Sequence, residues 1–376
     1  MALLGIHLTM LVGPVVPVPL AATLAENVEM VSVRHTDEGP SVAQLTLRVG
    51  KGGVTGIAND LLLKTQVRLG ARLQILVTTG ILPQVLFDGF LTAREWSPGS
   101  APGSSLFTAT AEDPTYKMDL VDQAAEHPAQ PDIAIVAKII ASYGHVPLVI
   151  PPPAFDVPIP IERVPSQQGS DLAYLRQLAA RYGYVFYLIP GPAPGLITGY
   201  WGPPVRPGLP QSALTVDMGG QTNVISFSAT VQNTRATLVQ GEVLDRQTGQ
   251  TIPVFTATSS RPPLGLAPVL LQDPTSLRFQ RLREPGLNIV QAFSRAQAIT
   301  DASTDDAVTA SGSLNTAQYG GLLQNRALVG VRGAGFDFDG YWRVTSVTHA
   351  IRKGSYHQDF TLKRGELGAL LPTVIP

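Results

Sequence analysis

The chain contains no cysteine among its 376 residues, so disulfide bonds, thiolate metal sites and cysteine nucleophiles are excluded. Charged side chains are also scarce, because Asp, Glu, Lys and Arg make up only 15% of the chain and the formal net charge is −1. A nucleic-acid partner would need a basic surface, which this balance does not supply. With 44% hydrophobic residues, 36 Gly and 32 Pro, we expect a turn-rich protein that covers much of its surface with partner subunits.

The first 25 residues lack charge altogether, which raises the question of a signal peptide or a membrane anchor. A signal peptide begins with basic residues, but none precedes Arg34. A membrane-spanning helix needs about 20 apolar residues in a row, and Gly13-Pro14, Pro17 and Pro19 interrupt this run. We therefore predict two buried strands and a loop here, no stable membrane insertion, and assembly in the cytoplasm without a signal peptide.

Short runs rich in Val, Leu and Thr, separated by turn formers, dominate both ends of the chain and predict β-strands. In the amino-terminal part they are two runs within 28–49 split by residues 37–40, followed by 73–78, 85–95 and 106–111. In the carboxyl-terminal part, strands are predicted over 213–231 and 328–363. Five or six short antiparallel strands fit a small sandwich or barrel, so the predicted fold class is mainly β.

The middle of the chain has a different texture. Asp132 is expected to cap a helix over 133–143, and Ser170 is expected to cap a second helix that Gly183 ends. With a strand over 184–189, these helices predict a compact α+β unit. The remaining segments are predicted as a Pro- and Gly-rich linker over 190–210, an irregular region over 235–285, and an alanine-rich helix over 287–309.

The two strand-rich ends resemble each other in the order of their signals. Phe87-Asp88-Gly89 follows an apolar strand, and Phe107 lies in a final strand 20 residues beyond Phe87. Phe338-Asp339-Gly340 has the same setting, with Phe360 lying 22 residues beyond Phe338. Asp-Gly suits a tight turn with positive φ, beneath which the Phe can pack. We predict a duplicated barrel, so that three copies of the chain would present six similar barrels in a ring.

Motifs for catalysis or cofactor binding are absent or incomplete. The chain has no G-x-S-x-G and no H-E-x-x-H motif. Gly50-Lys51-Gly52-Gly53 lacks the upstream glycine spacing and the following helix of a phosphate loop. The Gly330–Gly335 run lies between predicted strands, whereas a dinucleotide site needs a helix after it. We predict no catalytic residue, no cofactor-binding residue and no metal ligand.

The remaining charged groups and the histidines are interpreted as structural. The acidic groups are Asp301, Asp305 and Asp306 in one cluster and Asp337 and Asp339 in another. The first cluster lacks the Gly and closing Glu of a calcium loop, which indicates a solvated helix end. The second alternates with two phenylalanines, so its carboxylates should point outward and the rings inward. His349 is interpreted as a structural histidine, and a small basic end forms a solvated rim or partner contact that consists of Arg352, Lys353, Lys363 and Arg364.

Several longer segments resemble one family. They are Ala111–Pro114 leading into Met118–Leu120, Gln167–Leu175 continuing into Leu178–Tyr187, and, near the carboxyl end, Asp339–His349, Gly354–Tyr356 and Phe360–Leu362. On these residues the chain resembles the tail-hub proteins of contractile phages, the late-control D family. It is also similar to the matching half of valine-glycine-repeat G spikes in type VI secretion, and to the hubs of extracellular contractile injection systems.

The resemblance implies a non-enzymatic baseplate hub that joins a sixfold inner tube to a threefold spike as a homotrimer. Implied partners are a separate spike protein, an inner-tube or tube-initiator protein and other baseplate subunits, with no nucleic-acid specificity and no cofactor. The spike is expected to be separate because the chain ends at Pro376, soon after the second barrel. The implied domains are tube-type β-barrels over 1–112 and over 211–234 with 325–368, an inserted α+β domain over 113–210, an irregular and helical insertion over 235–324, and a carboxyl-terminal tail over 369–376.

Two other functions stay open from the sequence. An enzyme that acts on glycan or peptidoglycan in the same particle would need two carboxylates that converge in a cleft. A carbohydrate-binding β-sandwich would need Trp96, Trp201 and Trp342 to line one face. The type of particle, whether phage, secretion system or extracellular injection system, is also left open.

Overall fold

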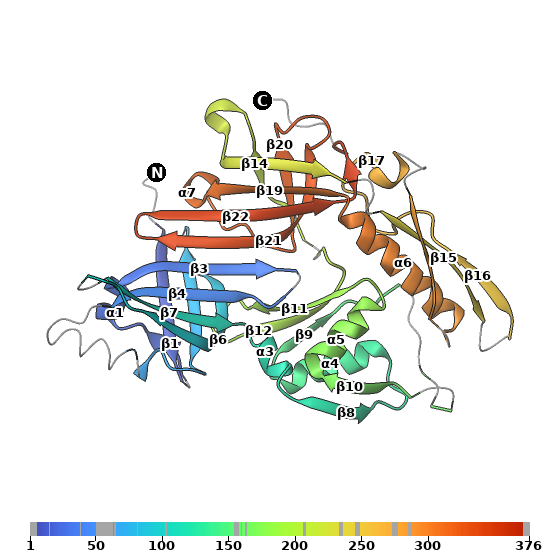
Figure 1. Ribbon diagram of the computed structural model, residues 1–376, viewed down its shortest axis with the longest axis horizontal. Coiled ribbons are helices and arrows are strands. Elements are labelled where there is room, and N and C mark those ends of the chain that lie inside the picture. Colours follow the sequence, from blue (N-terminus) through green and yellow to red (C-terminus); the bar gives the residue numbers. More distant parts are fainter. Residues whose placement is uncertain are drawn as a thin grey trace.

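The computed structural model describes most of the chain. The described residues are 6–14, 16–37, 39–49, 63, 65–80, 82–101, 104–153, 158, 160–161, 164–205, 208–232, 236–244, 249–272, 277–284 and 287–370. One large sheet runs through the molecule, and smaller units that combine helices with short sheets lie along one side of it (Figure 1). Among the described helices, none is long and apolar enough to cross a membrane.

The amino-terminal part contains six main strands that we call the first module. They are β1 (His7–Gly13), β3 (Val28–Thr36), β4 (Val42–Val49), β5 (Arg72–Thr78), β6 (Gln84–Ser97) and β7 (Ser105–Glu112). They pair in the order β3-β4-β7-β6-β5-β1. Alternation along the strands buries one face, and Val31, Val33 and Leu45 are at most 1% exposed. The second buried strand predicted near the amino terminus is wrong, because β2 (Val18–Pro19) is exposed and a short helix, α1 (Ala22–Glu26), follows it.

Six strands near the carboxyl terminus form the second module. They are β13 (Gln211–Thr215), β14 (Val224–Val231), β19 (Val308–Asn315), β20 (Leu328–Arg332), β21 (Gly340–Arg352) and β22 (Ser355–Arg364). They pair in the order β14-β19-β22-β21-β20-β13. Helix α7 (Thr316–Tyr319) follows β19. Trp342, Val344 and Leu362 are fully buried in the core of this module.

The two modules have the same strand order. Taken along the chain, β1, β3, β4, β5, β6 and β7 correspond to β13, β14, β19, β20, β21 and β22. The bulges coincide as well, at 28–30 of β3 and 224–226 of β14, and at 91–93 of β6 and 344–346 of β21. One difference is that β1 is antiparallel to β5 whereas β13 is parallel to β20. The predicted duplication is confirmed at the level of strand order.

The two modules join into one sheet because β3 pairs antiparallel with β21, from Met30 opposite Arg352 to Thr36 opposite Ser346. Eight strands then lie side by side in the order β14-β19-β22-β21-β3-β4-β7-β6, which we call the shared sheet (Figure 1). Strand β21 serves both modules because residues 340–343 pair with β20 and residues 346–352 pair with β3. Among the described residues, no ladder closes either module into a complete barrel.

The sequence signal that suggested the duplication is wrong in register. When the ladders are matched, Phe87 is equivalent to Gly340, two residues after Phe338. In the final strands, Phe107 is equivalent to Gln358, two residues before Phe360. The two Phe-Asp-Gly segments therefore serve different purposes. Gly89 lies inside β6, where a Cβ would meet the carbonyl oxygen of Glu112 at 2.2 Å. Gly340 begins β21 with a φ of 112°, a conformation that favours glycine.

The described part of residues 113–205 forms the predicted α+β unit. Its elements are α3 (Thr115–Met118), β8 (Asp122–Glu126), α4 (Asp132–Ser142), β9 (Val146–Val149), β10 (Ser166–Ser170), α5 (Asp171–Ala180), β11 (Val185–Pro190) and β12 (Ile197–Gly202). Ser170 caps α5 as predicted, because its Oγ accepts from the backbone N–H of Ala173 at 3.2 Å. Asp132 does not cap α4; it is the first helical residue and accepts from Arg181 Nη1 at 3.1 Å. The linker predicted over 190–210 is wrong, because β12 pairs with β11 and β9 and buries Trp201.

The segment between β14 and β19 is more regular than the sequence suggested. It contains a three-stranded sheet of β15 (Thr237–Leu244), β16 (Thr251–Phe255) and β18 (Arg278–Arg281), a helix α6 (Ile289–Asp305), and the short strand β17 (Ala267–Pro268), which pairs with β23 (Glu366–Leu367). The predicted helix is confirmed, but the irregular region over 235–285 is wrong. Gly241 and Pro253 interrupt the apolar alternation of β15 and β16, which explains why the strand signal was weak. Strand β19 also lies in the segment that was predicted to be an insertion.

Candidate functional site

The glycine motifs do not assemble a cofactor site in the described part of the chain. Gly50-Lys51-Gly52-Gly53 lies outside the described residues. The Gly330–Gly335 run leaves β20 and enters a turn before β21, so no helix follows it. A search of the described residues finds no group of three His, Cys, Asp or Glu side chains that could hold a metal ion. That no residue of the chain binds a metal or a cofactor stays a prediction.

The first acidic cluster lies at the end of α6, but it is not the solvated helix end that was predicted. Asp301 is 6% exposed and accepts hydrogen bonds from the backbone N and the Oγ of Ser260 at 2.8 and 2.7 Å. The neighbouring carboxylates form ion pairs, Asp305 with Arg261 and Asp306 with Lys363. These carboxylates bind the helix end to the chain around it, because each meets a donor from another segment.

In the second acidic cluster and the basic end, Asp339 and Arg364 are more buried than predicted, whereas Asp337, Arg352 and Lys353 are exposed as predicted. Residues 336–338 form a turn rather than a strand, so an alternation of period two does not apply. Phe336 is therefore 79% exposed, whereas Asp339 is 8% exposed and accepts from the backbone N–H of Ala334 at 2.8 Å. Arg364 is 1% exposed; its guanidinium carbon lies 4.2 Å from the ring centroid of Trp342, and it donates to the Asp339 carbonyl at 3.0 Å. Arg364 is thus a core residue and not part of a solvated rim.

The three tryptophans do not line one face. Trp201 is fully buried in the α+β unit, together with Leu175 and Val136. Trp342 is fully buried in the second module. Trp96 is 52% exposed near the end of β6. The carbohydrate-binding sandwich required all three rings on one surface, and this arrangement does not provide it.

A charged cleft of 590 Å³ lies where the shared sheet meets the α+β unit and α6. Asp37 is central to it, because its carboxylate lies 3.1 Å from Arg326 Nε and 2.5 Å from Arg343 Nη1. Burial raises the pKa of Asp37, although the two guanidinium groups beside it act in the opposite direction. The other two carboxylates of this cleft, Asp305 and Asp306, are ion-paired as well. The carboxylates of this cleft therefore join chain segments through ion pairs, and they are not a pair that is free for acid–base chemistry.

Two histidines face each other where β3 pairs with β21. His35 Nδ1 lies 3.0 Å from Ser41 Oγ, and His349 Nδ1 lies 2.9 Å from the Tyr356 hydroxyl. The ring centroids are 5.8 Å apart. Burial lowers the pKa of His35 to about 4, with Arg326 nearby adding to the effect, and burial also lowers the pKa of His349 well below its ordinary value. His349 is thus a buried, uncharged histidine at the junction of the two modules, which fits the structural role predicted for it.

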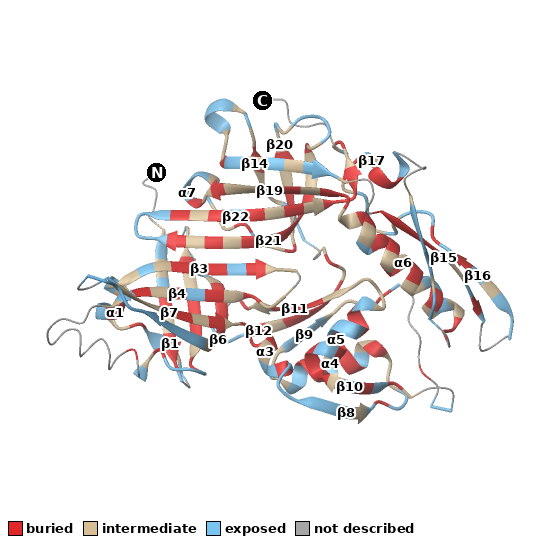
Figure 2. Ribbon diagram, in the orientation of Figure 1, coloured by how far each residue is buried: buried red, intermediate tan, exposed pale blue. Residues whose placement is uncertain are grey.

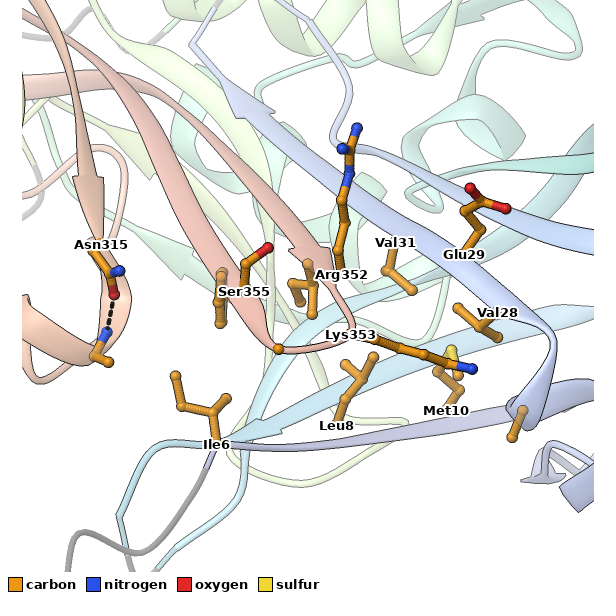
Figure 3. A pocket seen from close by; sticks show the side chains of 15 residues that line it. Ile6, Leu8, Met10, Val28, Glu29, Val31, Asn315, Arg352, Lys353 and Ser355 are labelled. Carbon is orange, nitrogen blue, oxygen red and sulfur yellow. Dashed lines mark hydrogen bonds between the residues drawn. The ribbon is translucent and has the colours of Figure 1, made fainter.

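A hollow of 580 Å³ opens at the other end of this junction, between β1, β3 and the turn from β21 to β22 (Figure 3). Leu8 and Met10 of β1, with Ile6 just before it, line one side of the hollow. Lys353 crosses from the turn and donates to the Glu26 carbonyl oxygen at 2.6 Å. The hollow therefore lies between β1 of the first module and the turn from β21 to β22 of the second module, and its lining is largely apolar.

Among the described strands, none from either module covers one face of the shared sheet; the end of this face near Asp37 lines the charged cleft together with α6 and the α+β unit. Residues directly opposite each other on neighbouring strands share a face, and the face turned away from the two cores, which we call the polar face, is mostly Ser and Thr. These are Ser32, Thr36, Thr46, Ser97, Thr108, Thr110, Ser226, Ser228, Thr230, Thr309, Ser311, Ser313, Ser346, Thr348, Ser355 and Thr361. Five cations (Arg34, Arg48, Arg343, Arg352 and Lys363) and three anions (Glu95, Glu112 and Asp359) also lie on it. Strands β22, β21 and β3 alternate buried and less buried positions along their length (Figure 2).

The shared sheet ends in two open edges. Among the described strands, β14 pairs only with β19, and residues 93–97 of β6 pair only with β7. All five residues of that β6 segment are exposed, and on β14 the side chains of Ile225 and Val231 are 57% and 39% exposed. In the second module the segment equivalent to 93–97 is 346–350 of β21, which is paired with β3 and is buried or half-buried. An edge strand with exposed apolar side chains is a ready partner for another strand.

Comparisons with known proteins place this fold. The chain matches no protein-family model and no curated protein. Its structure is similar to a tail protein from Neisseria meningitidis (11% identity, TM-score 0.63, 96% of this chain and 97% of that one). It is also similar to a 43 kDa prophage tail protein from Shewanella oneidensis (12%, 0.64, 96% and 99%), and to an Escherichia coli component of the type VI secretion system (14%, 0.53, 92% and 77%). The chain therefore has the fold of phage tail and type VI secretion proteins, which confirms at the level of the fold the resemblance seen in the sequence.

Proposed function

We propose that the chain is a structural hub subunit of a phage-tail-like injection particle, in which a homotrimer joins a sixfold inner tube to a threefold spike. The observation that carries the proposal is the repeat of one strand order in two modules of the same chain. Three copies of such a chain present six alike modules at one end while the assembly keeps threefold symmetry. Closed rings of identical subunits are the usual form of such assemblies.

The same proposal makes the chain non-enzymatic. The described carboxylates that line the charged cleft are ion-paired with arginine or lysine, and the histidine pair is buried and uncharged in character. A glycan-acting enzyme would need one carboxylic acid and one carboxylate around a bound sugar. The fold neighbours named above, which are tail and secretion proteins, support a structural role.

The proposed partners follow from the two symmetries. The six-module end would contact an inner-tube or tube-initiator protein, and the threefold end would contact a separate spike protein, with other baseplate subunits around them. We propose assembly in the cytoplasm. For the domains, we propose that β19 belongs with the second module, because it pairs between β14 and β22; the other boundaries stay as predicted from the sequence.

The polar face is the proposed wall of the central passage. The opposite face of the shared sheet is covered by β1, β5, β13 and β20 in the two modules, and a second layer of strands needs roughly 10 Å of additional depth. That layer has more room outside a ring than inside it. Small hydroxyl side chains, interspersed with charges of both signs, give a passing macromolecule little apolar surface on which to adhere.

Copy number tests the proposal most simply. Purified particles are dissociated gently, and native mass spectrometry measures the mass of the complex that contains this chain. We expect three copies, bound to spike or tube subunits. A stable monomer that binds neither spike nor tube subunits, or one that is an active enzyme without partners, would overturn the proposal.

A further inference from the structure

We infer that the apolar hollow between β1 and the turn from β21 to β22 seats a loop of the tube-side partner, and that this loop carries an apolar side chain next to an aspartate or glutamate. The tube-side partner is the subunit of the sixfold ring that would stack on this chain, whether inner-tube protein or tube initiator. The inference rests on the proposed function and identifies where on the chain that partner binds.

The hollow lies at the end of the shared sheet from which neither inserted unit leaves. Arg352 and Ser355 flank the turn beside the hollow at this end. Glu112 and Val231 lie at the other end, where β7 and β14 stop and the chain enters the α+β unit and the unit that contains α6 (Figure 1). Among the described residues, the end with the hollow holds strand ends, turns and helices of at most five residues. It is therefore the end at which the two modules are most alike, as a sixfold partner requires.

The floor of the hollow is apolar. Side chains of three strands line it, which are Leu8, Met10, Val28, Val31 and Ile351. Figure 3 shows Leu8, Met10 and Val28 gathered beside Lys353. The volume of 580 Å³ falls in the range of roughly 300–1,000 Å³ that binding pockets occupy. An apolar side chain seated in such a pocket is the usual anchor of a protein interface.

The rim of the hollow carries two cations that form no ion pair with a described carboxylate. Lys353 donates to the Glu26 carbonyl oxygen at 2.6 Å, and Arg352 donates to a methionine sulfur at 3.5 Å. The nearby carboxylate of Glu29 is already paired with Arg48 at 2.8 Å. The positive charge of the rim is thus left for a carboxylate that the partner brings. Together, the apolar floor and the basic rim select a loop in which an apolar residue adjoins an acidic one.

Carbodiimide cross-linking tests the contact directly, because it joins a lysine amine to a carboxylate that touches it. Purified particles are treated with the carbodiimide, and the peptide linked to Lys353 is sequenced by mass spectrometry. We expect an Asp or Glu of the tube-side partner. Lys353→Arg is the matched control, since it keeps the charge and the attachment of the tube but removes the reactive amine. A link from Lys353 to the spike protein, or to another copy of this chain, would overturn the inference.

Two variants test whether the hollow is needed for attachment. Arg352→Glu with Lys353→Glu reverses the charge of the rim, and Ala317→Trp covers the hollow from an exposed position of α7. Each should lower the amount of tube-side partner that copurifies with the chain at least about ten-fold. The controls are Lys138→Glu and Ala141→Trp, the same kinds of change at exposed positions of α4 in the α+β unit, and they should leave the amount unchanged.

Native mass spectrometry of the same preparations separates this inference from the proposed function. Three copies bound to the spike protein show that each variant has folded and assembled. If the two hollow variants then keep the tube-side partner at the wild-type level, the inference is wrong and the proposed hub stands on other contacts. A wild-type complex with a different number of copies overturns the proposed function itself.

Discussion

The joined junction and the open edges use equivalent strands but differ in what surrounds them. His349 on the joined strand is 1% exposed, whereas its equivalent on the open edge, Trp96, is 52% exposed. Val33 of β3 is fully buried, whereas its equivalent on β14, Ala229, is half-buried. The same strand order thus forms one buried junction inside the chain and leaves the two equivalent edges exposed. The comparison teaches that the isolated chain exposes surface which its own architecture is able to bury.

The largest expected difference in stability is between equivalent positions of β3 and β14. Val33→Lys places a charge in the core, and we expect it to lower the free energy of unfolding by more than about 4 kcal/mol. The equivalent Ala229→Lys should cost less than about 1 kcal/mol in the isolated chain and should instead prevent ring assembly. Urea unfolding and native mass measure the two effects, and equal losses of stability would contradict the comparison.

The next effect concerns the ion pairs of Asp37 with Arg326 and Arg343 at the joined junction. Asp37→Asn removes the carboxylate partner of Arg326 and leaves Arg343 only the longer contact with Asp305 at 3.6 Å, and we expect a loss of about 3 kcal/mol. Glu29→Gln is the matched control, because the pair of Glu29 with Arg48 is solvent-exposed and should contribute under about 0.5 kcal/mol. Chemical denaturation measures both variants, and similar midpoints for the two would show that Asp37 does not hold the junction.

The joined junction should also weaken in acid. His35 titrates near pH 4 when folded, below its usual pKa of 6.5, so the unfolded chain binds the proton first. Stability is therefore complete above about pH 6.5 and is lost as the pH falls toward 4, by on the order of 3 kcal/mol. The measurement is the free energy of unfolding against pH. His35→Gln should make the curve less steep in this window, to which His349 also contributes because burial lowers the pKa of its ring as well.

The smallest expected effect on stability lies on the open edge. His349→Ala removes a buried ring and its hydrogen bond to Tyr356, and should cost about 2 kcal/mol. The equivalent Trp96→Ala should cost under about 1 kcal/mol in the isolated chain, since half of the ring is already in solvent. In particles, however, it should weaken contacts between copies. Thermal unfolding of each variant tests the ranking, which fails if Trp96→Ala is the more damaging change.

Most strands of the two modules could be predicted from the sequence, because apolar residues alternate between clear turn signals in β3 to β7 and in β20 to β22. The short sheet of β15, β16 and β18 was missed, since Gly241 and Pro253 break that alternation. Strand β12 was missed because the flanking Pro and Gly residues made its surroundings look like a linker. The repeat was predicted from two Phe-Asp-Gly segments that turned out not to be equivalent. The strand order, and not the tripeptide, establishes it.

The residues that hold the modules together could not be predicted in the same way. Asp37 meets Arg326 and Arg343 across 289 and 306 residues of sequence, and no local pattern marks such a pairing. His349 was interpreted as structural, but its partner His35 was not anticipated. The open edges also depend on pairing over long distances, because a strand is an edge only with respect to its neighbours in space.

The measurement that tests the central claim most directly is a map of the intact particle by electron cryomicroscopy, resolved well enough to trace strands. The account predicts three copies of the chain in one ring, with the polar face of each shared sheet turned toward a central passage. A ring with another number of copies, or one in which the polar face is turned away from the passage, would contradict it.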